Sequence, residues 1–301
     1  MKMNIKSLIT LHILNSNYYL ARITYYSWLS IKLSIKQPIL VYSMGKVGSS
    51  TLLISLESAN LGLPVYQTDA LTDRELAKDE AFFYGNTRRY LRKAKLPETR
   101  YLFISYYLLH RIKSNSLGEK DNKLKVITMT REPIARNISD FFEQIEYWVP
   151  NFSERLQANS ISIDELTHIF LDKYNNHIET LTWFESEFKE ALKVDLYQHE
   201  FPTSKGYMIC EDESIQVLVM RLEDLRKCHE YAFEEFLGRK VPLVNANEAV
   251  NKEYNALYRK FLSSVVLPSN YVEKMYTSQY VRHFYSPEEI SAFRAKWHVI
   301  P

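Results

Sequence analysis

Cysteine, glycine and proline are all scarce in this chain of 301 residues, which contains two, seven and ten of them. The two thiols, Cys210 and Cys228, cannot form a disulfide framework, and they are too few for a structural zinc site. They suit a reducing compartment, so we expect a cytoplasmic protein. Because glycine and proline mark turns, each of their few positions carries information about where elements end.

Long apolar runs are also absent, since no stretch of the sequence reaches the roughly 18 apolar residues that a membrane span needs. Residues 7–21 start beside a charge and include a short apolar run, but they lack the small-residue cleavage site of a signal peptide. We therefore expect an N-terminal basic and aromatic segment, residues 1–37, and one domain, residues 38–301. The segment is either an ordered helix or a stretch that rests on a membrane surface.

Acidic residues are missing before Glu57, although basic ones occur there, and a second basic stretch follows at residues 88–125. That stretch holds eleven Lys or Arg residues against three acidic ones. The whole chain has a net charge of only +2, which excludes a polycationic nucleic-acid binder. Residues 88–125 are either a solvated face or a surface that attracts an anionic substrate.

Short apolar runs alternate along the chain with segments of helical periodicity. Buried strands are expected at residues 38–43, 63–67, 125–130 and 215–222. Helices are expected at residues 49–60, 78–113 with a break near Pro97, 133–147, 163–173 and 180–192, and again from 223 and from 251. The core stripe of the helix at 133–147 is Ile134, Ile138, Phe141 and Ile145. Alternating strands and helices predict a three-layer α/β fold with a central parallel sheet.

The loop between the first strand and its helix has the composition of a phosphate cradle. Gly45 and Gly48 allow a tight turn and a close approach of the backbone to an anion, and Lys46 adds a positive charge. The helix that follows presents free N–H groups, and its dipole favours negative charge. Three hydroxyls open it: Ser49, Ser50 and Thr51. The order differs from a nucleotide triphosphate P-loop, whose lysine follows the last glycine, and an ordinary glycine turn is the alternative.

A second candidate anion site lies at the carboxyl end of the strand at residues 125–130. Arg131 follows the strand directly, and Ser139 lies eight residues later, within the first two turns of the next helix. A guanidinium fork and a hydroxyl so placed can share one phosphate. The alternative is an arginine that caps a loop and a serine that faces a helix neighbour.

The two sites together resemble a known family. Residues 44–51 (Met-Gly-Lys-Val-Gly-Ser-Ser-Thr) resemble the 5′-phosphosulfate loop of sulfotransferases, whose sulfuryl donor is 3′-phosphoadenosine-5′-phosphosulfate (PAPS). Residues 131–139 (Arg-Glu-Pro-Ile-Ala-Arg-Asn-Ile-Ser) resemble their 3′-phosphate motif, including its Arg–Ser spacing. The likeness extends to bacterial capsular polysaccharide synthesis proteins and to Golgi glycan sulfotransferases, and a looser likeness is scattered between residues 183 and 297.

The resemblance implies the sulfotransferase fold and a role for each matched residue, without a metal ion. Lys46 would contact the oxygen that bridges phosphate and sulfate, where charge develops as the bond breaks. Arg131 and Ser139 would bind the 3′-phosphate, and Lys252 would be a late contact to the same nucleotide. The other nucleotide-binding positions form the 5′-phosphate loop: Gly45, Val47, Gly48, Ser49, Ser50 and Thr51.

The chain departs from this family at the general base. Several glycan sulfotransferases have a histidine just after the second strand, where this chain has Asp69. A carboxylate can abstract the acceptor proton, particularly if burial raises its pKa above about 3.9. Asp69 is alternatively a helix N-cap for residues 72–77. His110 is the rival base, and an inactive relative without a base stays open.

These observations predict an enzyme that transfers a sulfuryl group from PAPS to a hydroxyl of a capsular or other polysaccharide, with an anionic glycan as the candidate acceptor. Trp148 and Trp183 are candidates for stacking on a sugar, and core packing is the alternative for both. A metal-dependent glycosyltransferase is disfavoured because the motif Asp-x-Asp occurs nowhere in the sequence. A metal-independent glycosyltransferase and a non-catalytic capsule-assembly protein are the alternatives.

Overall fold

A five-stranded sheet forms the centre of the computed structural model, which describes residues 18–33, 36–84, 96–114, 116–117, 122–244 and 253–300. Its strands, in their spatial order, are β2 (Val65–Thr68), β1 (Ile39–Tyr42), β3 (Leu124–Thr130), β5 (Ile215–Arg221) and β4 (Tyr207–Glu211). β1 pairs in parallel with β2 and β3, and β3 pairs in parallel with β5. The four expected strands therefore form and run in one direction.

β4 is the strand that the sequence analysis missed, and it makes the sheet mostly rather than wholly parallel. It runs antiparallel to β5 at the edge of the sheet. Asp212 turns the chain between the two strands, because its Oδ1 accepts hydrogen bonds from the amides of Ser214 and Ile215 at 2.8 Å. An antiparallel partner needs only such a short turn, whereas parallel neighbours need longer crossovers.

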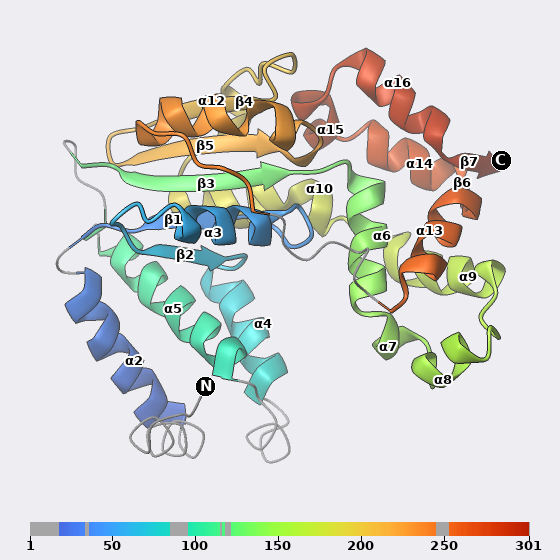
Figure 1. Ribbon diagram of the computed structural model, residues 1–301, viewed down its shortest axis with the longest axis horizontal. Helices are drawn as coiled ribbons and strands as arrows, with labels where there is room; N and C mark the ends of the chain where they lie inside the picture. Colours follow the sequence, from blue (N-terminus) through green and yellow to red (C-terminus); the bar gives the residue numbers. More distant parts are fainter. Residues whose placement is uncertain are drawn as a thin grey trace.

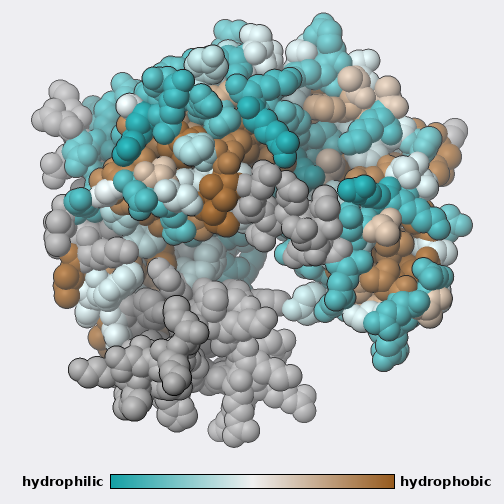
Figure 2. Space-filling model, viewed as in Figure 1, coloured by the Kyte–Doolittle hydropathy of each residue, from teal (hydrophilic) through white to brown (hydrophobic). Residues whose placement is uncertain are grey.

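Helices cover both faces of the sheet, as a three-layer fold requires (Figure 1). α3 (Ser49–Ser58) and α12 (Leu225–Leu237) lie in front of the strands, and α10 (Glu179–Trp183) lies behind them. Burial on both faces explains the apolar sequence of β1, whose four residues are all fully buried. Hydrophilic side chains cover the upper edge over α12, and hydrophobic ones reach the surface between α12 and α3 (Figure 2).

α6 (Pro133–Glu143) follows β3 and carries the expected core stripe. The buried residues of that stripe are Ile134, Ile138 and Phe141, together with Ile145 of α7 (Ile145–Trp148). Glu132 caps α6, because its carboxylate accepts hydrogen bonds from the amides of Ile134 and Ala135 at 2.8 Å. A break at Gln144 makes two helices of the single one expected.

The second half of the chain adds mainly helices. They are α8 (Phe152–Gln157), α9 (Ile163–Tyr174), a π-helix (Phe184–Lys189), α11 (Glu190–Leu192), α13 (Asn255–Ser264), α14 (Ser269–Tyr276), α15 (Gln279–Phe284) and α16 (Pro287–Lys296). Short 3-10 turns lie at Leu196–Gln198 and Leu222–Asp224, and β6 (Val266–Pro268) pairs in parallel with β7 (His298–Ile300). The helix expected at residues 180–192 is therefore α10, a π-helix and α11 in succession, and such π segments often occur at functional sites.

The N-terminal segment is described from Tyr18, where α2 (Tyr18–Leu33) begins and packs against α5 (Leu96–Lys113). Leu29 is fully buried, and the rings of Tyr26 and Tyr107 meet edge to face, with 5.4 Å between their centroids. No helix in the described part of the chain is long and apolar enough to cross a membrane. Residues 1–17 lie outside the described residues, so contact of this segment with a membrane surface stays a prediction.

α4 (Asp73–Tyr84) and α5 occupy the region expected to be helical at residues 78–113. Residues 85–95 between them lie outside the described residues. Pro97 lies in the first turn of α5, where its missing N–H costs no helical hydrogen bond, and α4 and α5 are separate helices, as the expected break near Pro97 requires.

Candidate functional site

Two pockets lie at the carboxyl ends of the parallel strands, the edge at which α/β sheets bind ligands. We call the first the loop pocket, and its volume is about 790 Å³. The second, the Asp69 pocket, has a volume of about 750 Å³. Gly45 lines both, so the two pockets meet at the loop that follows β1.

The loop pocket brings together most residues of the two predicted phosphate motifs. Those that line it are Gly45, Lys46, Gly48, Ser49, Ser50, Thr51, Arg131 and Ser139. Its charged lining comprises four basic residues, Lys46, Arg131, Arg226 and Lys227, and two acidic ones, Glu143 and Glu223. The lining therefore has a positive formal charge, which suits an anion.

The turn between β1 and α3 depends on Gly48. Its φ is 92°, in the left-handed region, and a Cβ at this position would lie 2.7 Å from Leu222 Cδ1. Lys46 also has a positive φ, 70°, although it carries a side chain. Left-handed backbone costs a non-glycine residue about 1–2 kcal/mol, so the surrounding structure must hold Lys46 in this conformation. Such strain clusters in functional loops.

The first turn of α3 lies at the loop pocket. Gly48 precedes the helix and has no side chain that could cap it. Ser49 Oγ accepts a hydrogen bond from Gln67 Nε2 at 3.1 Å, which ties the turn to β2. The positive end of the helix dipole and the hydroxyls of this turn are therefore directed at the same space as Lys46.

Arg131 connects the two motifs. Among the described residues its guanidinium makes one hydrogen bond, from Nη1 to the carbonyl oxygen of Lys46 at 2.8 Å. The Tyr280 hydroxyl fixes the backbone, because it accepts from Arg131 N at 2.9 Å and donates to Arg131 O at 2.8 Å. Arg131 thus caps the loop with one nitrogen, and the rest of its five-donor fork can face an anion together with Ser139.

Lys46 crosses the loop pocket to α6, where its Nζ lies 3.4 Å from Glu143 Oε2. The two side chains are 26 % and 44 % exposed, so water screens the pair. Exposed ion pairs contribute about 0.2–1 kcal/mol. A phosphate that enters the pocket can therefore compete with Glu143 for the lysine.

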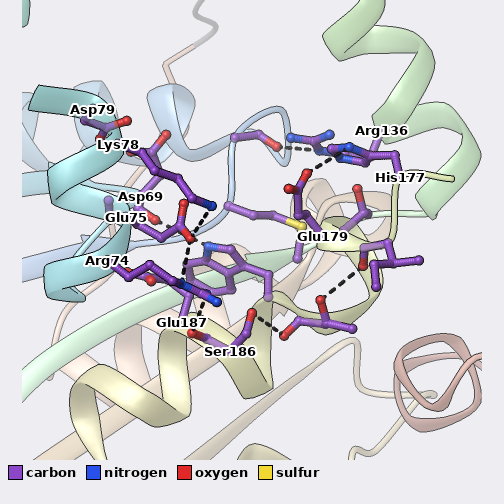
Figure 3. Close-up of a pocket in the computed structure, with 17 residues that line it drawn as sticks. Asp69, Arg74, Glu75, Lys78, Asp79, Arg136, His177, Glu179, Ser186 and Glu187 are labelled. Atoms are coloured by element: carbon purple, nitrogen blue, oxygen red, sulfur yellow. Dashed lines mark hydrogen bonds and ion pairs between the residues drawn. The ribbon is translucent and has the colours of Figure 1, made fainter. Parts of the chain in front are cut away.

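The Asp69 pocket is built from four parts of the chain. These are Met44 and Gly45 after β1, the loop after β2 with α4, Arg136 on α6, and residues 177–187 around α10 and the π-helix. Figure 3 shows the α4 side chains on one side and Arg136 with His177 on the opposite side. Arg136 Nε donates to the carbonyl oxygen of Gly45 at 3.0 Å, which places this guanidinium at the junction with the loop pocket.

Asp69 lies where the second strand ends and does not cap α4. Thr72 takes that role, since its Oγ1 accepts a hydrogen bond from Glu75 N at 3.3 Å. The backbone of Asp69 is held on both sides, with its amide donating to Tyr101 Oη at 3.1 Å and its carbonyl accepting from Trp183 Nε1 at 3.3 Å. Water reaches the residue through the pocket, yet surrounding protein desolvates the carboxylate and, with the charge of Glu187, raises its pKa to about 6.

Glu187 on the π-helix organises the wall behind Asp69. Its buried carboxylate accepts hydrogen bonds from Tyr42 Oη at 2.8 Å and from the amide of Thr72 at 3.0 Å. The Thr72 hydroxyl also donates to it, at 2.5 Å. One side chain therefore joins the end of β1, the start of α4 and the π-helix.

His177 and Glu179 are pocket residues that the sequence analysis missed. His177 Nδ1 lies 2.8 Å from Glu179 Oε2, and both line the Asp69 pocket. The hydrogen bond from His177 holds the pKa of Glu179 below its usual range. No motif marks this pair, and only the folded chain brings it opposite Asp69.

Several predicted residues lie elsewhere. His110 is exposed on α5 and lines neither pocket, so it is not placed to act as the base with Lys46. Val47 is fully buried in the core beneath the loop and does not line the loop pocket. Lys252 lies outside the described residues. Of the two tryptophans, Trp183 lines the Asp69 pocket, whereas Trp148 lines neither pocket.

Both cysteines are buried and free, and desolvation raises the pKa of each thiol to about 11. Across the residues that the structure describes, no group of three or more His, Cys, Asp or Glu is arranged to hold a metal ion. The side chains that line the two pockets include cations, hydroxyls and carboxylates.

Residues 155–286 match a family model, NKWYS, whose description reads "Putative capsular polysaccharide synthesis protein". The match supports the likeness to capsular polysaccharide synthesis proteins. It covers β4, β5 and one side of the Asp69 pocket, but neither phosphate motif. No curated protein and no solved structure matches the chain.

Proposed function

We propose that this protein is a sulfotransferase of capsule synthesis, which transfers a sulfuryl group from PAPS to a hydroxyl of a polysaccharide in the cytoplasm. One observation carries the proposal. Two motifs about eighty residues apart, each with the composition of an anion site, line a single pocket at the strand ends. The family match supports a role in capsular polysaccharide synthesis.

The loop pocket fits a nucleotide with phosphates at both ends of its ribose. The turn at Gly48 and the first turn of α3 suit the 5′-phosphosulfate, and Arg131 with Ser139 suits the 3′-phosphate. An apolar side suits the adenine base. It is formed by Leu222, Leu225, Leu243 and Tyr258.

The residues divide the chemistry between the two pockets. In the transfer, the acceptor oxygen forms a bond to sulfur, the bond from sulfur to the 5′-phosphate oxygen breaks, and the acceptor loses its proton. Lys46 stabilises the negative charge that develops on the departing phosphate oxygen. Asp69 accepts the proton, and its raised pKa makes it a stronger base than an ordinary aspartate.

A metal-independent glycosyltransferase is the alternative enzyme, and it would need no site for a 3′-phosphate. Binding of 3′,5′-bisphosphoadenosine, compared with 5′-AMP, separates the two classes by calorimetry. We expect the bisphosphate to bind at least about tenfold more tightly, since a charge-assisted hydrogen bond contributes roughly 1.5–3 kcal/mol. Equal affinities would contradict the proposal.

Arg131→Ala should weaken bisphosphoadenosine binding by about one to two powers of ten and leave 5′-AMP binding nearly unchanged. Arg155→Ala, which removes a partly buried arginine paired with Glu165 on α9, is the matched control. Circular dichroism confirms that each variant folds. Unchanged bisphosphate affinity in a folded Arg131→Ala protein would exclude the 3′-phosphate site.

A further inference from the structure

We propose that the Asp69 pocket is an acceptor subsite that selects sugar residues without acidic groups. The inference rests on the proposed function, because it assigns the second substrate to the second pocket. It replaces the expectation of an anionic glycan. Three features carry it: the position of the pocket, its aromatic side chain and its charge.

The pocket lies where an acceptor has to lie. The Asp69 pocket meets the loop pocket at Gly45, the residue before Lys46. Asp69 is one of the residues that line it. Its volume of about 750 Å³ is within the usual range for a small-molecule site, which is about 300–1,000 Å³. A hydroxyl in this pocket would have a carboxylate on one side and the donor site on the other.

Trp183 gives the pocket a fixed aromatic surface. Its indole meets Tyr42 edge to face, with ring centroids 5.0 Å apart, and its Nε1 donates to the Asp69 carbonyl. The ring is only partly buried, so the remainder faces the pocket. A rigid aromatic side chain that is apolar on its face and polar at its edge is suited to the mixed surface of a sugar ring.

The charge of the pocket opposes an anion. Five carboxylates line it, from Asp69, Glu75, Asp79, Glu179 and Glu187, against three basic side chains, from Arg74, Lys78 and Arg136. The basic groups are already paired. Glu75 Oε1 lies 3.1 Å from Arg74 Nε and 2.8 Å from Lys78 Nζ. Arg136 Nη1 lies 3.2 Å from Asp140 Oδ2.

Burial raises the pKa of Asp79 to about 7, and the neighbouring carboxylates of Asp69, Glu75 and Glu187 add to the shift. A further carboxylate or sulfate would be repelled here, whereas sugar hydroxyls can donate charge-assisted hydrogen bonds to the carboxylates present.

The basic stretch at residues 88–125 does not reverse this charge in the described part of the chain. Its described basic side chains bind partners outside both pockets. Lys113 pairs with Asp73, Lys123 lies 3.2 Å from Glu211, and Lys125 donates to Gln216 and to the Phe236 carbonyl. Arg111 donates to Tyr107 and Ser116.

Three hexasaccharides of equal length test the inference by calorimetry at low salt: N-acetylated chitohexaose, which is neutral, its deacetylated amine form, and a hyaluronan hexamer, which is anionic. We expect the neutral and amine forms to bind, and the anionic one to bind at least about tenfold more weakly. Trp183→Ala should weaken chitohexaose binding about tenfold without affecting bisphosphoadenosine. Equal or tighter binding of hyaluronan, or no binding of any of the three, would overturn the inference.

A charge-matched pair of variants makes the test specific. Glu75→Gln with Asp79→Asn removes two carboxylates from the pocket and should bring hyaluronan binding close to that of chitohexaose. Glu154→Gln with Asp164→Asn changes the total charge equally at exposed positions outside both pockets, and it should change nothing. Bisphosphoadenosine binding is measured separately, so failure of the donor assignment and failure of the acceptor assignment give different results.

Discussion

The loop pocket and the Asp69 pocket have similar volumes and share Gly45, but their linings carry opposite formal charge. The first has four basic residues against two acidic ones, and the second has three against five. By formal charge, the loop pocket attracts anionic groups and the Asp69 pocket repels them. Two adjacent pockets of opposite charge can thus set the orientation of two substrates before either makes a specific contact.

The largest expected effect concerns the proposed base, Asp69, which lines the Asp69 pocket and not the loop pocket. Asp69→Asn should lower turnover by roughly 10²–10⁴ and leave bisphosphoadenosine affinity unchanged. Because the pKa of Asp69 is about 6 and the base must be deprotonated, wild-type kcat/KM should rise as the pH rises through 6 and level off above it. The variant should lose this limb of the profile.

His177→Asn is the comparison that makes the result decisive, since His177 lines the same pocket. If the histidine were the base, its substitution would cause the large loss and remove the pH limb, while Asp69→Asn would keep both. That outcome would identify His177, on the opposite side of the pocket, as the base.

Lys46→Ala tests the loop pocket at the transferred group. Turnover should fall by about 10², because the lysine acts on charge that appears only as the bond breaks, and donor affinity should fall much less. Steady-state kinetics combined with nucleotide calorimetry separate the two quantities. An equal loss in both would show that Lys46 is a ground-state phosphate contact.

Gly48→Ala should distort the loop pocket without touching the lining of the Asp69 pocket. The left-handed φ costs about 1–2 kcal/mol, and the contact with Leu222 adds to it. Gly238→Ala is matched, since Gly238 has φ 73° but no atom within 4 Å of the new Cβ. In urea unfolding, the Gly48 variant should lose more stability than the Gly238 variant, and only the former should lose nucleotide affinity. Similar losses would mean that close approach at Gly48 is unimportant.

Glu143→Gln should give the smallest effect, and in the opposite direction. It removes a competitor for Lys46 and a negative charge from the loop pocket, so bisphosphoadenosine affinity should rise up to about fivefold. Glu165→Gln, which breaks the partly exposed pair with Arg155 outside both pockets, is the control with no expected change. A decrease in affinity would show that Glu143 positions Lys46 instead of competing for it.

The loop pocket and the Asp69 pocket also differ in how far the sequence predicted them. Gly48, Lys46 and Arg131 lie in loops that follow buried strands, where chain order alone fixes which edge of a parallel sheet they occupy. The core stripe of α6 could also be predicted, because helical periodicity depends only on the spacing of nearby residues.

The Asp69 pocket could not be predicted in the same way. His177, Glu179 and Glu187 come from a region of the sequence more than a hundred residues after Asp69, and tertiary packing alone brings them together. The antiparallel strand β4 was missed because its placement depends on pairing with β5. His110 was weighed as a base from residue type, but the orientation of α5 decides its exposure.

The strand order β2-β1-β3-β5-β4 decides which segments of the chain can fold when they are expressed alone. The segment that matches the capsular synthesis family supplies β5 and β4, whereas β2, β1 and β3 come from residues before 155. All seven residues of β5 are paired with β3. A polypeptide restricted to residues 155–286 would leave that side of β5 as an open, apolar edge, which is prone to aggregate. The matched segment therefore supplies two of the five strands, and a complete sheet also needs the strands that precede the two predicted phosphate motifs.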